Sequence, residues 1–122
     1  PEKLRALTAR ARSLAEELIE AIGGGVLLHP AHLTSAPHHR FTYGRPWLIT
    51  PTAVFNLAGV PVTEVPMGLD ARGLPVGIQV AAAPGADYLS IAVAIELEAV
   101  LGGWRPPLHL GAPNTERTDA PA

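Results

Sequence analysis

Apolar residues recur at three- and four-residue spacing over the first 22 positions, which predicts an amphipathic helix. The predicted apolar face consists of Leu4, Leu7, Ala11, Leu14, Leu18 and Ile22. Three glycines at 23–25 end this helix, because glycine adopts the left-handed cap conformation without a Cβ clash. The apolar run 26–28 follows, between glycine and proline, and predicts a short buried strand.

The segment from Pro30 to Thr50 contains three prolines and predicts a long loop without regular structure. A loop of this length in a compact domain usually serves function or packs on a partner. Thr50 and Pro51 suit the N-cap and first position of a short helix over 52–57, which Gly59 would close.

Two strands, 61–65 and 75–82, are predicted next. In the second, larger apolar residues alternate with Gly77, Gln79 and Ala81, which gives the strand two unlike faces. Residues 70–73 form the turn between them, with Gly73 available for a positive φ. We therefore expect two neighbouring antiparallel strands.

Residues 88–101 predict a last helix, with Asp87 as its N-cap and glycine at 102 and 103 ending it. Its side chains are apolar nearly all round, and such a helix is normally covered on most sides. We expect it to be buried, in part against protein outside this chain. Residues 1–107 would form the folded part, and 108–122, rich in proline and polar residues, a flexible tail.

The composition narrows the class of protein. The chain has 122 residues, enough for one domain, and 48% of them are hydrophobic, which suffices for a core. Its net charge of −2 and lack of a basic stripe argue against nucleic acid as a partner. No apolar run approaches the ~20 residues of a membrane span. The absence of cysteine excludes thiol chemistry and is compatible with a cytoplasmic location, which we expect.

The run from Phe55 to Val80 reads FNLAGVPVTEVPMGLDARGLPVGIQV. It resembles a stretch near the C-terminus of amidase-signature hydrolases, where an FN..G.P...VP.G.D..GLPVG.Q pattern recurs. We interpret the shared positions as a structural motif that sets the backbone. They are Asn56, Gly59, Pro61, Pro66, Gly68, Gly73, Pro75, Gly77 and Gln79.

The flanking segments indicate a particular subgroup of this family. Residues 87–104 and the histidine-containing stretches 28–32 and 36–39 are similar to the second type of fatty-acid amide hydrolase and its bacterial relatives. That subgroup carries lysine before a pair of histidines, where this chain has His38. The likeness runs from about residue 25 to about residue 107, in the expected order of motifs.

The resemblance implies an α/β fold, the C-terminal part of a mixed sheet flanked by helices. It also implies hydrolysis of linear amides, with fatty-acid amides as one substrate class, by a Ser–cis-Ser–Lys triad. The chain has a single lysine, Lys3, and no adjacent serines. The triad must therefore lie outside this chain, which would be the C-terminal piece of a longer enzyme and inactive alone.

Two alternatives stay open. The chain could be a non-catalytic interaction module, or one chain of a two-chain enzyme. In the amidase interpretation, its partners are a small-molecule amide substrate and the N-terminal part of the same protein, and no cofactor is implied.

Several residues are candidates for chemistry. Four histidines within eleven positions suit zinc, but no carboxylate lies among them, so we predict no metal site. A triad of Ser35, a histidine and an aspartate lacks the strand–turn–helix elbow that would expose the serine. The substrate-pocket candidates, for which local packing is the competing interpretation, are His38, Tyr43, Trp47, Phe55 and Asn56.

Overall fold

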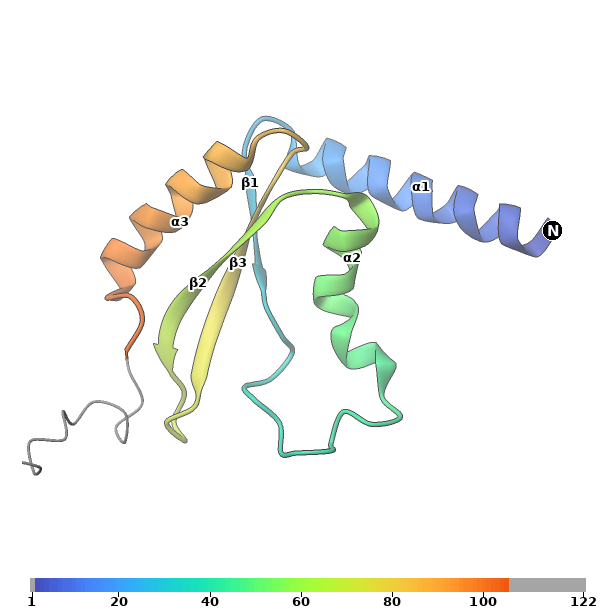
Figure 1. Cartoon of the computed structure of the whole chain (residues 1–122). Coiled ribbons are helices and arrows are strands. Elements are labelled where there is room, and N and C mark those ends of the chain that lie inside the picture. Colours follow the sequence, from blue (N-terminus) through green and yellow to red (C-terminus); the bar gives the residue numbers. More distant parts are fainter. Residues whose placement is uncertain (1, 106–122) are drawn as a thin grey trace, which may run out of the picture.

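The computed structural model describes residues 2–105 and places a three-stranded sheet between helices (Figure 1). The order of elements is α1 (Glu2–Ile22), β1 (Val26–Pro30), η1 (Pro46–Ile49), α2 (Thr50–Ala58), β2 (Val62–Leu69), β3 (Pro75–Ala82) and α3 (Asp87–Leu101). The strands are arranged β1-β3-β2, and both pairings are antiparallel. The predicted α/β class and antiparallel strand pair are confirmed. The predicted tail, 108–122, lies outside the described residues.

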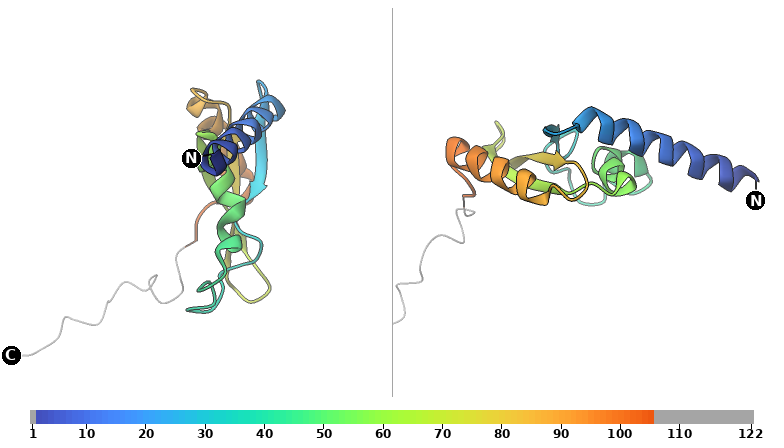
Figure 2. Two further views of the ribbon diagram at one scale, coloured as in Figure 1. Left: turned by 90° about the vertical axis from the view of Figure 1, so that its right-hand side faces the viewer. Right: turned by 90° about the horizontal axis from the view of Figure 1, so that it is seen from above.

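The sheet has two covered faces. On the face that we call the α3 face, Val65 and Val80 pack with Ala94 of α3. On the opposite face, the α2 face, Phe55 packs with Ile22 and Ala81. Seen from above, α3 lies on one side of the strands, and α2 and the end of α1 lie on the other (Figure 2).

Only the end of α1 joins the core. Ile22 is buried and Leu18 packs beside it, but Leu4, Leu7 and Leu14 are exposed. Figure 1 shows why, since the N-terminal half of α1 projects beyond the sheet. The predicted apolar face is therefore covered at one end alone within residues 2–105.

Strand β2 is longer than the predicted 61–65. A bulge between Pro66 and Gly68 leaves Met67 as the extra residue, and the strand continues to Leu69. Pro66 is tolerated because β2 is an edge strand. Gly68 has φ +111° at this point. Strand β1, predicted as buried, is an edge strand, and its Leu28 is exposed.

Helix α2 begins earlier than predicted. Residues 46–49, expected to be irregular, form a 3₁₀ turn that runs directly into it. Thr50 has helical dihedral angles and bonds back to the carbonyl of Trp47, so it is not the N-cap. Gly59 ends the helix as predicted, with φ +66°.

Helix α3 begins at Asp87, so its N-cap is Ala86 and not the predicted Asp87. No side chain makes a capping hydrogen bond at this end of the helix. The predicted burial of α3 holds for one face only. Ala94 packs on the sheet, whereas Ile91, Ile95 and Val100 are exposed. The expectation that protein outside this chain covers that side stays a prediction. Among residues 2–105, no helix combines the length and apolar character needed to cross a bilayer.

Candidate functional site

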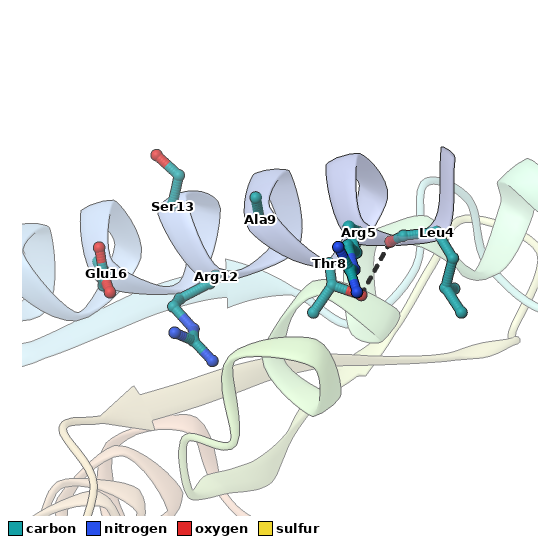
Figure 3. Close-up of a pocket in the computed structure, with 7 residues that line it drawn as sticks. All are labelled: Leu4, Arg5, Thr8, Ala9, Arg12, Ser13 and Glu16. Carbon is teal, nitrogen blue, oxygen red and sulfur yellow. Dashed lines mark hydrogen bonds between the residues drawn. The ribbon is translucent and has the colours of Figure 1, made fainter. Parts of the chain in front are cut away.

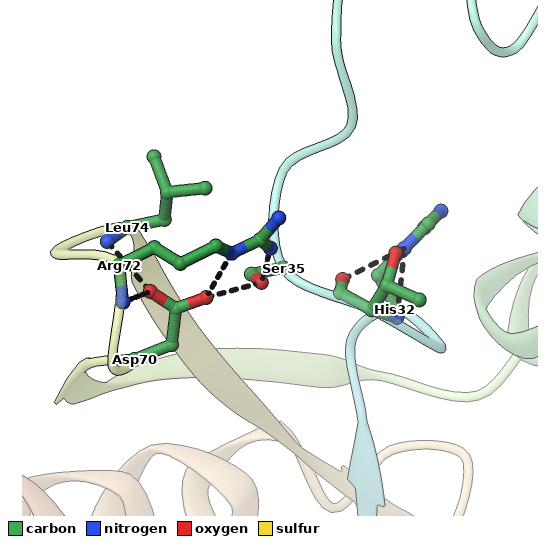
Figure 4. Close-up of polar contacts among 6 residues, drawn as sticks. His32, Ser35, Asp70, Arg72 and Leu74 are labelled. Atoms are coloured by element: carbon green, nitrogen blue, oxygen red, sulfur yellow. Dashed lines mark hydrogen bonds and ion pairs between the residues drawn. The ribbon is translucent and has the colours of Figure 1, made fainter.

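The long loop after β1 is fastened to the turn of the β2–β3 hairpin. Ser35 donates from Oγ to Oδ2 of Asp70 over 2.5 Å, and Arg72 donates from Nε to the same oxygen over 3.2 Å. Figure 4 shows the three side chains converging from two segments that are distant in sequence. The contact fixes one end of the loop against the sheet.

The second oxygen of Asp70 holds the turn itself. Oδ1 accepts hydrogen bonds from the backbone N–H groups of Arg72 (2.8 Å) and Leu74 (2.9 Å). The hydrogen bond from Ser35 is the largest cause that lowers the pKa of the Asp70 carboxyl, followed by that from Leu74 N–H. Together they hold this pKa far below its ordinary value, so the carboxylate stays charged.

A groove of about 650 Å³ lies between this loop and the hairpin. The loop side contributes His32 and Ser35, and the hairpin side contributes Glu64 and Gly77. Trp104, beyond α3, also lines it. Its walls are mostly apolar with a few polar groups, which is the usual character of a small-molecule site.

A polar row crosses the α2 face next to the groove. Gln79 of β3 lies opposite His29 of β1 and Glu64 of β2. A Cβ built on Gly77 would collide with Oε1 of Glu64, so the Glu64 carboxylate lies over this glycine. Burial raises the pKa of the Glu64 carboxyl, and a hydrogen bond with the Gln79 side chain partly offsets this.

The predicted substrate-pocket residues do not meet in one place. Phe55 is 3% exposed and belongs to the core, where its ring and that of His29 meet edge to face with centroids 5.2 Å apart. Tyr43 and Trp47 are 77% and 57% exposed. His38 and Asn56 are exposed as well, and none of the five lines the groove.

The motif residues have mainly backbone roles. Gly59, Gly68 and Gly73 have positive φ, a conformation that glycine adopts readily. Pro75 begins β3, and the carbonyl of Pro61 accepts a hydrogen bond from Ala82 N–H over 3.1 Å. The amide oxygen of Gln79 is buried without a partner among the described residues.

No serine of the chain has the setting of a nucleophile. Ser35 contacts Asp70 directly and accepts a hydrogen bond from Arg72, and the structure gives it no histidine partner. Ser90 is 1% exposed and bonds to the Thr63 hydroxyl over 3.0 Å. Ser13 lies on the exposed side of α1.

Two of the histidines, His29 at the end of β1 and His32 in the loop, bond to backbone groups. Nδ1 of His29 donates to the carbonyl oxygen of Pro30 over 2.8 Å. Nδ1 of His32 lies 2.9 Å from the carbonyl oxygen of Thr34. Within residues 2–105, no three side chains of histidine, cysteine, aspartate or glutamate gather closely enough to hold a metal ion.

A second hollow, of about 460 Å³, lies along α1, and its seven lining residues all belong to that helix (Figure 3). Arg5, Arg12 and Glu16 are its charged lining residues. Because one helix cannot enclose a ligand, we place the candidate site at the groove beside the hairpin instead.

Local sequence patterns did not reveal three features of this region: the pairing of Ser35 with Asp70, the contact of Arg72 with both, and the position of Glu64. The predicted hairpin turn gives one indication of where Glu64 lies. Pairing the residues of the two antiparallel strands one by one, away from the turn, brings Glu64 near Gln79. The bulge at Pro66 changes that count, and the pattern of residues does not reveal it.

The comparisons with known proteins agree on one family. The family model described as Amidase matches residues 3–90. The chain is 47% identical to fatty-acid amide hydrolase 2 of Homo sapiens over 104 residues, which are 84% of this chain and 20% of that protein. It is 46% identical to fatty-acid amide hydrolase 2-A of Danio rerio over 96 residues, 78% of this chain and 18% of that protein.

A bacterial relative is more distant. The chain is 36% identical to 6-aminohexanoate-cyclic-dimer hydrolase of Paenarthrobacter ureafaciens over 61 residues, 50% of this chain and 12% of that protein. No solved structure matches the chain significantly. The chain spans about a fifth of the length of the two fatty-acid amide hydrolases named above. Because the family model matches well over half of its 122 residues, the chain belongs to the amidase family.

Proposed function

We propose that the chain is the C-terminal part of an amide hydrolase that acts on linear amides, with fatty-acid amides as one substrate class. The observation that carries this proposal is the 47% identity to a fatty-acid amide hydrolase over 84% of the chain. The name of the bacterial relative, a hydrolase of a cyclic amide dimer, supports the broader reaction class. Because the chain spans a fifth of such relatives, most of the enzyme would lie outside it.

The reaction would be acyl transfer by a Ser–cis-Ser–Lys triad outside residues 1–122. One serine would attack the amide carbonyl, the second would relay its proton, and the lysine would act as the base. Two features of this chain favour an external triad. Lys3 lies on the exposed start of α1, and Ser35 and Ser90 are occupied by hydrogen bonds to other side chains.

This chain would complete the central sheet of the enzyme and form one wall of its substrate cavity. The groove between the loop and the hairpin supports this role, because its walls are mostly apolar and its polar groups are few. The fastening of Ser35 to Asp70 would hold the loop in place at the rim of that cavity.

Labelling with a fluorophosphonate tests the proposal. The native polypeptide is purified, its mass and N-terminal sequence are determined, and its hydrolysis of oleamide and of a short anilide is measured. We expect a polypeptide longer than 122 residues that hydrolyses these amides and carries the label upstream of Pro1. Label on Ser13, Ser35 or Ser90, or no amide hydrolysis by the native polypeptide, would contradict the proposal.

A matched control uses residues 1–122 expressed alone. This chain should neither hydrolyse the amides nor react with the fluorophosphonate, because its serines have no activating base. Turnover by the chain alone would place the catalytic residues within it and refute the external triad.

A further inference from the structure

The outer edge of β1 presents backbone groups that have no partner strand. The N–H of Ala82 donates to the carbonyl oxygen of Pro61, so Ala82 faces β2. Successive residues of a central strand bond to alternate neighbours, so Ala81 faces β1 and pairs there with Leu27. The same alternation turns the N–H and C=O groups of Leu28 away from β3, toward the edge of the sheet. Among residues 2–105, none of the hydrogen bonds outside the sheet ladders involves the Leu28 backbone.

The side chain of Leu28 lacks cover as well. It lies opposite Val80 and so projects from the α3 face of the sheet. Helix α3 covers Val80 on that face but leaves Leu28 46% exposed. Residues 26–28 are nevertheless apolar at every position, which is typical of a strand that is buried on both faces inside a sheet. A further strand beside β1 would reconcile this sequence with its position.

The outer edge of β2 has a different character. Here the alternation turns the backbone groups of Glu64 and Pro66 toward the edge, where Pro66 has no N–H to donate. Met67 follows as a bulge, which bends the strand. Charged side chains, prolines and bulges are the features by which proteins keep an edge strand from pairing. Residues 26–28 of β1 contain none of them, so β1 is the edge that suits a further strand.

We propose that the sheet continues at β1, where Val26–Pro30 pairs with a strand of the amidase polypeptide outside residues 1–122. The inference rests on the proposed function, which supplies that polypeptide, and it names the edge at which this chain joins the rest of the enzyme. The matched residues are 20% of fatty-acid amide hydrolase 2, so most of such an enzyme is available to provide the strand. Residues 106–122 are a poor source, because prolines recur in them.

Hydrogen exchange of the full-length protein, resolved to single amides, tests the pairing. With a strand beside β1, the Leu28 N–H should exchange about a hundredfold more slowly than the Glu64 N–H, which faces the edge of β2. The Val80 N–H, in the centre of the sheet, is the slow reference. A Leu28 N–H that exchanges as fast as the Glu64 N–H would overturn the proposal.

Proline variants of the full-length protein separate pairing from simple coverage. Leu28→Pro removes the outward N–H, which a ladder requires and an unpaired edge does not. With a paired strand, its melting temperature should lie about 3 °C or more below that of Leu28→Ala, which removes only the side chain. Glu64→Pro is the matched control, because it removes an outward N–H from the other edge, and it should lower the melting temperature by less than about 1 °C.

Equal melting temperatures of Leu28→Pro and Leu28→Ala would contradict the pairing, since an edge that is only covered tolerates proline. If Leu28→Pro fails to fold while Glu64→Pro folds, the proposal is supported. If neither folds, the exchange rates of the wild type decide.

Two further measurements on the wild type identify the source of the strand. A slow Leu28 N–H that becomes fast when the protein is diluted to a monomer would assign the strand to a second copy and overturn the proposal. Amide hydrolysis together with a fast Leu28 N–H overturns the pairing and leaves the proposed function intact. Absence of amide hydrolysis together with a slow Leu28 N–H overturns the proposed function instead.

Discussion

Ser35 donates a hydrogen bond to Asp70 over 2.5 Å, although the two residues lie 35 positions apart in the chain. One belongs to the long loop after β1, and the other begins the turn between β2 and β3. Arg72 contacts both side chains, so the three form a small polar cluster. This cluster connects the loop that rims the groove to the turn of the β2–β3 hairpin.

Replacing Ser35 by alanine should release the loop at modest cost. The variant loses the hydrogen bond that Ser35 donates to Asp70 and the one that it accepts from Arg72. Both are partly accessible to water, so we expect the free energy of unfolding to fall by about 1 kcal/mol. Denaturant titration measures this value. The control Ser13→Ala, on the exposed side of α1, should change it by less than about 0.5 kcal/mol. Equal effects of the two variants would show that the contact with Asp70 contributes nothing.

Asp70 should make the protein sensitive to acid. Its pKa in the folded state lies below the ordinary value of 3.8, so the folded state binds this proton more weakly than the unfolded state. The resulting stability is fully present above that ordinary value and is lost as the pH falls below it. Melting temperatures between pH 7 and about pH 2 should therefore decline less steeply in Asp70→Asn than in the wild type. Parallel curves would contradict this.

Local patterns in the sequence predicted the hairpin well. The alternation in 75–82 gave β3 its observed bounds, and Gly73 takes a positive φ in the turn, as expected. Both features depend on residues that are close in sequence, and a local sequence pattern contains this information. Gly59 likewise ends α2, because a helix end depends on the conformation of a single residue.

Other features of the fold differed from what the sequence patterns predicted. Thr50 is a residue type that favours the N-cap, but a 3₁₀ turn runs directly into the helix at this residue. The Thr50 hydroxyl therefore donates to the carbonyl oxygen of Trp47 and does not cap the helix. The leucines of α1 follow a regular apolar spacing, but only the end of this helix reaches the sheet. The partner of Ser35 is set by the folded path of a long loop, which no local pattern specifies.

Gly77→Ala should destabilise the protein through the row of side chains that crosses the sheet. The new Cβ would displace the Glu64 carboxylate, which can move, and would lie 3.2 Å from the carbonyl oxygen of Val65, which cannot easily do so. We expect a loss of about 1 kcal/mol in the free energy of unfolding. In a background of Glu64→Ala the loss should be smaller, which a double-mutant cycle measures. Gly24→Ala is the control, because its added Cβ meets nothing.

Additivity of the two substitutions would contradict this account. It would mean that the carboxylate does not lie over Gly77 in the folded protein, and that the glycine is required by the strand backbone alone. A loss at Gly24 as large as that at Gly77 would have the same meaning, since only a general effect of glycine replacement would then remain.

Substitutions of the aromatic residues distinguish packing from contact with a substrate. Phe55 is 3% exposed in the core, so Phe55→Ala should lower the free energy of unfolding by about 3 kcal/mol. Tyr43 is 77% exposed, and Tyr43→Ala should change it by less than about 0.5 kcal/mol. If Tyr43 lines the route to the substrate cavity, the same variant should raise the KM for a long-chain amide and leave that for a short anilide unchanged, because only the longer chain reaches the loop. Equal KM values for wild type and variant with both substrates would remove Tyr43 from the substrate-pocket candidates and leave it as a surface residue of the loop.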